Sequence, residues 1–255
     1  MTLINNVYEY LCSLAPLELQ MSFDNSGFQI GRLNKQLHRV LLALDVTDPV
    51  VNEALELGAE LIISHHPLIF SGIKTIDARD PAGERLLRLA ENGIAVISMH
   101  TNLDIATDGV NDVLMSLLGA EPAGVLDREN CGRVGYFKEA LTLSDFLEMS
   151  KKKLNANGLR YYDAGKPVSK LAVMGGAGGD NLEDAYALGC DTYLTSDIKY
   201  HQFLRAQELG INLIDADHFC TENPVIPAIR EKLSKEFNDV EFLVSNVHKQ
   251  IISFM

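Results

Sequence analysis

Histidine and carboxylate side chains occur close together at three places in the sequence. The three segments are His65-His66-Pro67, His100-x-x-x-Asp104 and His218-x-x-x-Glu222. Imidazole nitrogens and carboxylate oxygens, without any thiolate, suit zinc, manganese, iron and nickel. An aspartate or glutamate can also bridge two ions through its two oxygens. The three segments therefore predict a shared site for divalent metal ions, formed by His65, His66, His100, Asp104, His218 and Glu222.

Each segment also has a simpler structural explanation when it is taken alone. The histidine pair can belong to a surface loop, because Pro67 restricts His66 to an extended conformation and ends a strand. Asp104 or Asp108 can be the N-cap of the helix that follows. Glu222 precedes Pro224 and resembles the first turn of a helix, where the helix dipole stabilises a carboxylate. The metal site is favoured only by the three segments together.

Short β-branched runs alternate with amphipathic stretches in the first half of the chain. Strands are expected at residues 40–45, 59–64 and 94–98, and helices at 49–57, 81–92 and 109–118. This alternation predicts a parallel sheet covered by helices on both faces. Ligands bind such sheets at the carboxyl ends of the strands. His65, His66 and His100 follow such ends, whereas His38 and His248 are predicted to be surface residues.

The second half of the chain repeats this alternation. Helices are expected at 141–155, 181–188, 199–209 and 224–237, and strands at 170–174, 191–194, 211–215 and 240–244. The loop over 121–132 contains Pro122, Gly124 and Gly132 and is the predicted boundary between two lobes. The expected fold class is α/β, with two lobes of mostly parallel sheets covered by helices.

Three parts of the chain follow from that boundary. Residues 1–126 form the expected first lobe, which carries His65, His66 and Asp104, and residues 127–210 form the second. Residues 211–255 are expected to return to the first lobe with His218 and Glu222.

Two turns of the second half offer further chemistry. Gly175-Gly176-Ala177-Gly178-Gly179-Asp180 follows a strand and precedes a helix, so its backbone N–H groups can cradle a phosphate. The alternative is a tight turn that needs glycine for its backbone conformation. In the turn at 195–201, Lys199 or His201 can touch a substrate, or Ser196 or Asp197 can simply cap a helix.

The composition disfavours nucleic acid as a partner. The net charge of −13 repels a phosphate backbone, although a small anion held by metal remains compatible with it. The four scattered cysteines form no C-x-x-C motif, which predicts a reducing compartment. The N-terminal residues do not resemble a signal peptide, and no apolar run reaches the roughly 20 residues of a membrane span. A cytoplasmic protein without a membrane partner is therefore expected.

Four sequence blocks resemble the signatures of one family. They are Phe23-Asp24-Asn25-Ser26-Gly27-Phe28-Gln29-Ile30-Gly31, Ser64-His65-His66-Pro67-Leu68-Ile69-Phe70, Met99-His100-Thr101-Asn102-Leu103-Asp104 and Asp215-Ala216-Asp217-His218-Phe219-Cys220-Thr221-Glu222. In order and extent they are similar to the NIF-three-like family, whose members are often labelled GTP cyclohydrolase 1 type 2 homologs. The resemblance covers nearly the whole chain.

This resemblance implies a dinuclear metal site in the cleft of a two-lobed subunit, and a ring-shaped homohexamer whose sites face an inner cavity. The ligands that it implies are His65, His66, Asp104, His218 and Glu222, with His100 adjacent or ligating. Two positions depart from the family pattern. Asp217 and Ser196 stand where the family usually has glycine, and Asp217 adds a carboxylate beside His218.

Two functions from different classes remain open at this point. The first is a metal-dependent hydrolase, similar to GTP cyclohydrolase type 2, acting on a purine nucleotide or another small phosphate-bearing anion. In that hydrolase the expected proton carrier is His100, His201 or a carboxylate that binds no metal, and the cofactors are two divalent ions. The second is a non-enzymatic metal-binding hexameric ring, or a scaffold for protein interactions.

Overall fold

The chain crosses three times between two structural units in the computed structural model, which describes residues 1–255. The first unit contains residues 1–106 and 226–249, and the second contains 107–225 and 250–255. These bounds differ from the expected ranges of 1–126, 127–210 and 211–255. The difference arises because the helix after residue 109 and the segment at 211–225 pack within the second unit.

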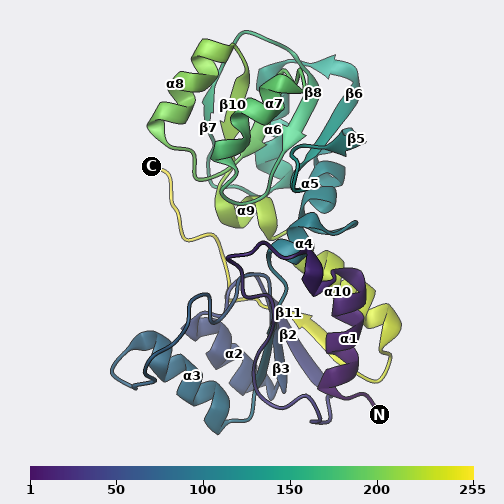
Figure 1. The fold of residues 1–255 in the computed structure, drawn as a ribbon, viewed down its shortest axis with the longest axis vertical. Coiled ribbons are helices and arrows are strands. Elements are labelled where there is room, and N and C mark those ends of the chain that lie inside the picture. The colour runs from purple at the N-terminus through teal and green to yellow at the C-terminus, as the bar shows by residue number, and fades with distance from the viewer. The chain divides into compact units, whose positions relative to one another are not determined.

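The first unit is built on a five-stranded sheet (Figure 1). Its strands are β1(Gly27–Ile30), β2(Arg39–Ala43), β3(Leu61–Ser64), β4(Ala95–Ser98) and β11(Glu241–Val244), in the order β1-β4-β3-β2-β11. All neighbouring strands are parallel except β1, which runs antiparallel to β4. Every residue of β3 and β4 is buried, as the continuous apolar runs of a doubly covered parallel sheet require.

Helices cover both faces of this sheet. They are α1(Ile4–Leu14), η1(Leu17–Leu19), α2(Asp48–Leu57), α3(Pro81–Glu91), α4(Thr101–Ile105) and α10(Val225–Glu236). Figure 1 shows α2 and α3 on one face and α1 and α10 on the other. The start of α2 is set by Thr47, whose side chain accepts the Val50 N–H, and its end by Gly58 at φ +65°. The helix over 49–57 is thereby confirmed with both ends defined.

The second unit contains a six-stranded sheet that is mixed rather than mostly parallel. Its strands are β5(Glu121–Val125), β6(Arg133–Leu141), β7(Arg160–Tyr162), β8(Val168–Val173), β9(Thr192–Thr195) and β10(Asn212–Asp215), in the order β5-β6-β8-β9-β10-β7. Only β8, β9 and β10 run parallel to one another. The expected parallel strands exist, but antiparallel strands extend the sheet at both edges.

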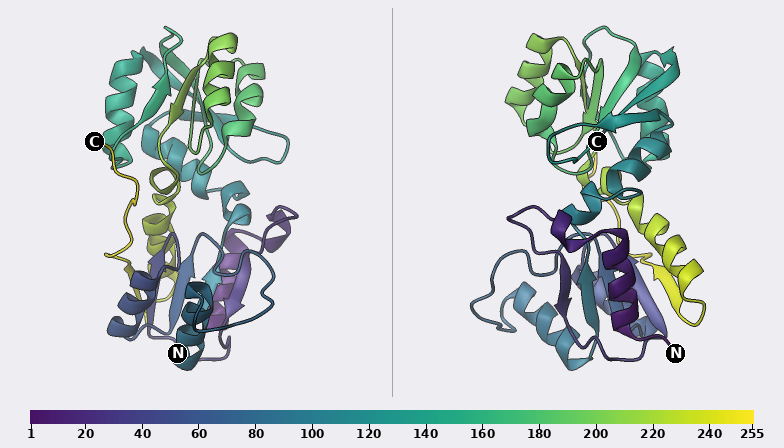
Figure 2. Two further views of the ribbon diagram at one scale, coloured as in Figure 1. Left: turned by 90° about the vertical axis from the view of Figure 1, so that its left-hand side faces the viewer. Right: turned by 45° about the vertical axis from the view of Figure 1, so that its right-hand side comes forward.

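Helices lie on both faces of this second sheet as well (Figure 2). They are α5(Val110–Leu118), α6(Leu143–Lys153), η2(Gly179–Asn181), α7(Leu182–Ala187), α8(Tyr200–Leu209) and α9(His218–Glu222). On one face Leu114 of α5 and Phe146 of α6 pack against Leu171 and Val173 of β8, and all four are fully buried. This apolar layer fixes β8, and the strands next to it, against the helices.

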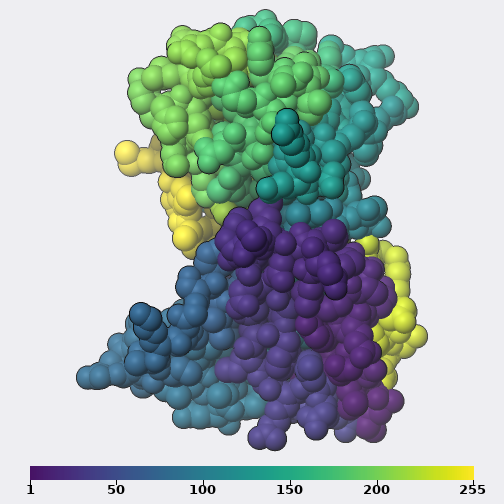
Figure 3. Space-filling model, in the orientation of Figure 1, coloured from purple at the N-terminus to yellow at the C-terminus, as the bar shows by residue number.

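None of the helices combines the length and apolar character that crossing a membrane requires. The last residues of the chain, 251–255, are exposed, and the bright yellow atoms on the left of Figure 3 belong to this end of the chain.

Candidate metal centre

Two neighbouring parallel strands of the first unit end beside the first candidate ligands. Ser64 at the end of β3 pairs with Ser98 at the end of β4, and their hydroxyl oxygens are 2.8 Å apart. The next two N–H groups, of His65 and His66, both donate to the Leu44 carbonyl oxygen, at 3.2 and 2.9 Å. Successive N–H groups of an extended strand point to opposite sides, so the chain turns here. The centroids of the two imidazole rings are consequently only 5.0 Å apart.

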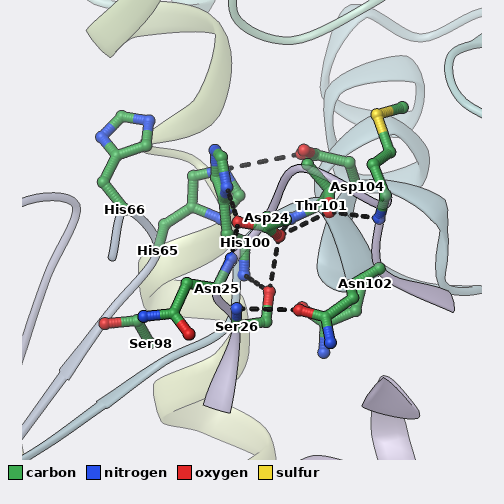
Figure 4. Close-up of polar contacts among 12 residues, drawn as sticks. Asp24, Asn25, Ser26, His65, His66, Ser98, His100, Thr101, Asn102 and Asp104 are labelled. Atoms are coloured by element: carbon green, nitrogen blue, oxygen red, sulfur yellow. Dashed lines mark hydrogen bonds and ion pairs between the residues drawn. The ribbon is translucent and has the colours of Figure 1, made fainter. Parts of the chain in front are cut away.

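We call His65, His66, His100 and Asp104 the first-unit cluster. The His100 ring lies 5.2 and 5.5 Å from the other two rings, and one nitrogen of each histidine lies within 4.8 Å of the others. Asp104 lies on α4, which begins directly after His100, and its Oδ1 is 3.5 Å from His65 Nε2 (Figure 4). Nitrogen and oxygen ligands therefore converge within one unit, in a combination that first-row divalent ions accept.

Each imidazole of this cluster has an acceptor oxygen at its Nδ1 atom. The acceptors are the Met99 carbonyl for His65 at 2.8 Å, Asp45 for His66 at 2.7 Å and Asp24 for His100 at 2.7 Å. An acceptor at Nδ1 holds the ring hydrogen there and leaves the Nε2 lone pair available. Metal-binding histidines nearly always carry such a second contact, which orients the ring and raises its basicity. The donor set and its supports therefore fit a divalent metal ion.

Asp24 is the most extensively bonded of these supports. Its side chain is fully buried and accepts hydrogen bonds from the His100 ring, from the N–H and hydroxyl groups of Thr101 and from the Ser26 hydroxyl (Figure 4). Burial by itself raises the pKa of the Asp24 carboxyl. The hydrogen bonds outweigh burial and hold that pKa well below its usual range, so the group stays ionised beside His100.

Asp45 supports two histidines at once. Its Oδ1 lies 2.7 Å from His66 Nδ1, and its Oδ2 lies 3.1 Å from His248 Nε2. Burial raises the pKa of Asp45, but the bonds to the two imidazoles outweigh it and leave the pKa well below its usual range. The prediction that His248 is a surface residue is therefore wrong, since its side chain is only 10% exposed. The same prediction for His38 is confirmed, because that side chain is 63% exposed.

The second unit carries its own pair of candidate ligands on α9. His218 begins this helix and Glu222 follows one turn later, so that His218 Nε2 lies 3.0 Å from Glu222 Oε2. His218 Nδ1 lies 2.7 Å from Asp197 Oδ2, which repeats the support seen in the first unit. Burial lowers the pKa of His218, but its hydrogen bonds to the two carboxylates raise it to about 11. The metal-free imidazole is therefore a cation held between two anions.

The turns that present these residues use aspartates in a left-handed backbone conformation. Asp197 has a φ of +54° and Asp217 a φ of +69°, a backbone conformation that glycine adopts without strain. The buried Asp217 side chain accepts the N–H of Cys220 and so caps α9. Ser196, the second departure, donates its hydroxyl hydrogen to the Gly176 carbonyl oxygen. Both substitutions therefore add a hydrogen bond next to His218.

The glycine-rich turn at 175–180 is not an open phosphate cradle. The N–H groups of Gly175, Gly176 and Gly178 donate to side chains of the protein itself, at 2.9 to 3.0 Å. A Cβ atom at Gly176 would overlap Glu222 Oε1, and one at Gly178 would overlap side chains of β9. Close packing thus accounts for Gly176 and Gly178, and Gly176, at φ +67°, also needs glycine for its backbone conformation.

The structure brings together the sequence candidates of each unit but leaves one aside. His65, His66, His100 and Asp104 converge in the first unit, and His218 and Glu222 in the second. His201 is exposed on α8 and belongs to neither group. Sequence reasoning missed the supporting aspartates 24, 45 and 197. Asp45 lies at the end of a predicted strand, so a search for acceptors at strand ends would have found it, whereas Asp24 lies in the loop before β1.

Known proteins are similar to this chain over nearly its whole length. The family model described as Duf34/NIF3 (NGG1p interacting factor 3) matches residues 2–251. A GTP cyclohydrolase 1 type 2 homolog of Clostridium perfringens is 35% identical over 99% of both chains. A protein of the same description from Methanocaldococcus jannaschii is 34% identical over 97% of both chains.

Solved structures are similar over the same extent. A Bacillus cereus protein related to NIF3 has a TM-score of 0.92 at 26% identity, covering 100% of this chain and 99% of that one. Reduced HcgD from Methanocaldococcus jannaschii has a TM-score of 0.85 at 32% identity, covering 96% and 98%. The chain therefore belongs to the Duf34/NIF3 family.

Proposed function

We propose that this protein is a metal-dependent hydrolase that holds a pair of divalent ions. His65, His66 and Asp104 of the first unit and His218 and Glu222 of the second would be the ligands. The observation that best supports the proposal is the shared arrangement of four imidazoles. The imidazoles at positions 65, 66, 100 and 218 each have an acceptor oxygen within 2.8 Å of Nδ1. Such a contact orients an imidazole so that its Nε2 atom can bind a metal ion.

The ions, when bound, would lower the pKa of water and polarise an oxygen of the substrate. Zinc, manganese, iron and nickel all suit this donor set. Asp104 and Glu222 would supply carboxylate oxygens, each able to face two ions. The three supporting aspartates would keep the imidazoles oriented while substrate enters and product leaves.

His100 is the proposed proton carrier. Its Nδ1 is 2.7 Å from the buried, ionised Asp24, which would stabilise the imidazole when Nε2 takes up a proton. The His100 side chain is 16% exposed, whereas that of His65 is fully buried, so His100 is the better placed to meet a substrate. His201 is a second candidate, since its exposure on α8 leaves it accessible.

The proposed substrate is a small phosphate-bearing anion, with a purine nucleotide as the leading example. The names of the relatives point to GTP, in which water would attack C8 and open the imidazole ring of the base. Net charge −13 makes a nucleic acid polymer a poor ligand, whereas bound divalent ions would attract a single nucleotide.

Turnover on a nucleotide panel tests the enzymatic reading. The protein loaded with manganese, zinc, iron or nickel should hydrolyse at least one nucleotide or phosphoester. His100→Asn should lower kcat at least 100-fold while metal content stays at the wild-type value. His38→Asn, at an exposed histidine of the same unit, is the matched control and should not change kcat. Full metal loading with no turnover of any substrate by wild type would contradict the proposal.

The second candidate is a non-enzymatic metal-binding ring or interaction scaffold. The family description names a protein interaction, which favours this alternative. A homohexamer is proposed with either function, and light scattering of the purified protein measures it directly. A metal-loaded hexamer that turns over no substrate would favour the scaffold.

A further inference from the structure

Two exposed phenylalanines stand together beside the first-unit cluster. Phe23 is 62% exposed and Phe70 is 51% exposed, although both are large apolar side chains. Their ring centroids are 6.4 Å apart and their planes are inclined by 53°. Two exposed aromatic rings in contact with each other mark a binding surface more often than a single exposed apolar residue does.

Hydrogen bonds between two loops hold these rings outside the core. Phe23 directly precedes Asp24, whose buried carboxylate is bonded to His100. Phe70 directly follows Ile69, whose carbonyl oxygen accepts the Asn25 side-chain N–H at 2.6 Å and whose own N–H donates to Gln29 at 3.1 Å. Both rings are therefore exposed because these hydrogen bonds fix the conformation of the two loops.

The aromatic pair is also continuous with the cluster itself. The centroid of the Phe70 ring lies 6.1 Å from that of His100, with the planes at 80°. Ile73 and Ile76 are also exposed on the same loop, but they have no aromatic ring on which a base could stack. A flat ligand lying on Phe70 would thus lie near the His100 ring.

We propose that Phe23 and Phe70 are a stacking surface for an aromatic ring of the substrate, a nucleobase or a similar planar heterocycle. This inference rests on the proposed function and adds the residues that would select its substrate. Every base has a π-face that stacks on phenylalanine, and such stacking typically changes affinity about 5-fold to 150-fold per base. The supports of His66 and His100 are carboxylates, which repel an anion, so stacking of the flat part of an anionic substrate would add affinity that these carboxylates do not supply.

Calorimetric titration with GTP and with inorganic triphosphate tests the stacking surface. Phe70→Ala and Phe23→Ala should each weaken GTP binding about 10-fold to 100-fold. Both variants should bind inorganic triphosphate within twofold of wild type and keep the wild-type metal content. Ile76→Ala, an exposed apolar residue of the same loop, is the matched control and should change neither affinity.

Two results would overturn the inference. One is that manganese-loaded wild type binds GTP no more tightly than inorganic triphosphate. The other is that both phenylalanine variants keep wild-type GTP affinity. The readout is binding, so tight GTP binding that depends on the two rings, without any turnover, would contradict the hydrolase and leave the stacking surface standing.

Discussion

At the scale of single residues, the partner behind each imidazole differs in charge. His65 has a neutral carbonyl oxygen at Nδ1, whereas His66, His100 and His218 each have a carboxylate. A carboxylate partner raises the basicity of an imidazole more than a carbonyl does, and it stabilises the ring when it carries a proton. Replacing the aspartate behind His66, His100 or His218 should therefore change metal binding without removing a metal ligand.

Asp45→Asn should weaken metal binding without removing a ligand. The amide oxygen can still accept from His66, but the negative charge behind two imidazoles is lost, so we expect about 10-fold lower affinity for manganese or zinc. Titration calorimetry measures it. Asp48→Asn is the matched control, because Asp48 is half-exposed and bonds Arg85 rather than a histidine. Equal affinities in the two variants would count against the supporting role of Asp45.

The ligand candidates were predictable from the sequence, but the pairing of Asp24 with His100 was not. Imidazoles directly after β-branched runs identify the carboxyl ends of parallel strands, which is why His65, His66 and His100 were found. Asp24 lies 76 residues before His100 in the sequence, and its partner is decided by how the loop over 21–26 folds onto α4. Such pairings depend on the tertiary structure, so no local sequence pattern predicts them.

At the scale of elements, buried strands and amphipathic helices were predicted to within a few residues. The runs at 59–64 and 94–98 became β3 and β4, and the helix over 81–92 became α3. The prediction that residues 121–132 form a loop was wrong for residues 121–125, which form β5. Pro122 and Gly124 indicate turns, but β5 is an exposed edge strand, where proline is tolerated.

Gly176→Ala should disturb Glu222 in addition to straining the backbone. Gly176 has a φ of +67°, and an added Cβ would overlap the Glu222 carboxylate. Gly189, at φ +72°, has open space around its Cα, so Gly189→Ala measures the backbone cost alone. That cost is about 1–2 kcal/mol, and Gly176→Ala should lose about 1–3 kcal/mol more because of the overlap.

Urea unfolding and metal titration of both variants measure these effects. Gly176→Ala should also bind metal more weakly than wild type, whereas Gly189→Ala should not. If the two variants were equally stable and bound metal equally well, Glu222 would not depend on the turn at Gly176.

Glu60 ties the starts of two parallel strands together in a pH-dependent way. Its carboxylate accepts the N–H groups of His38 and Arg39 at 3.1 and 2.8 Å. Burial raises the pKa of Glu60, but these backbone hydrogen bonds outweigh burial, and the pKa in the folded protein is lowered. A lowered pKa stabilises the fold above the unfolded-state pKa, near 4.3, and this stabilisation disappears as the pH falls through the folded-state pKa.

Glu60→Gln should therefore cost about 1 kcal/mol at pH 7 and less at pH 3. Urea unfolding of both proteins at the two pH values measures the difference. Glu56→Gln is the control, because Glu56 lies on the preceding helix α2 and does not accept the N–H groups of His38 and Arg39. A cost that grew as the pH fell would have the wrong sign for this account.

At the scale of the whole molecule, the chain leaves the first unit after α4 and returns to it with α10. The first-unit cluster and the pair on α9 therefore lie on different units. The acceptor oxygens at the Nδ1 atoms of each group come from the same unit as its histidines. The sequence indicated both groups because each follows a predicted strand. The crossing points were not predictable, since residues 107–126 carry the same helix and turn signals whichever unit they join.

Metal content measured by mass spectrometry after dialysis, with one histidine removed from each unit in turn, tests the metal centre most directly. Wild type should retain two divalent ions per chain, as should His38→Ala at the exposed control position. His65→Ala and His218→Ala should each lose at least one ion while circular dichroism shows the fold unchanged. Wild type without a stoichiometric divalent ion, or variants that keep its full content, would contradict the account.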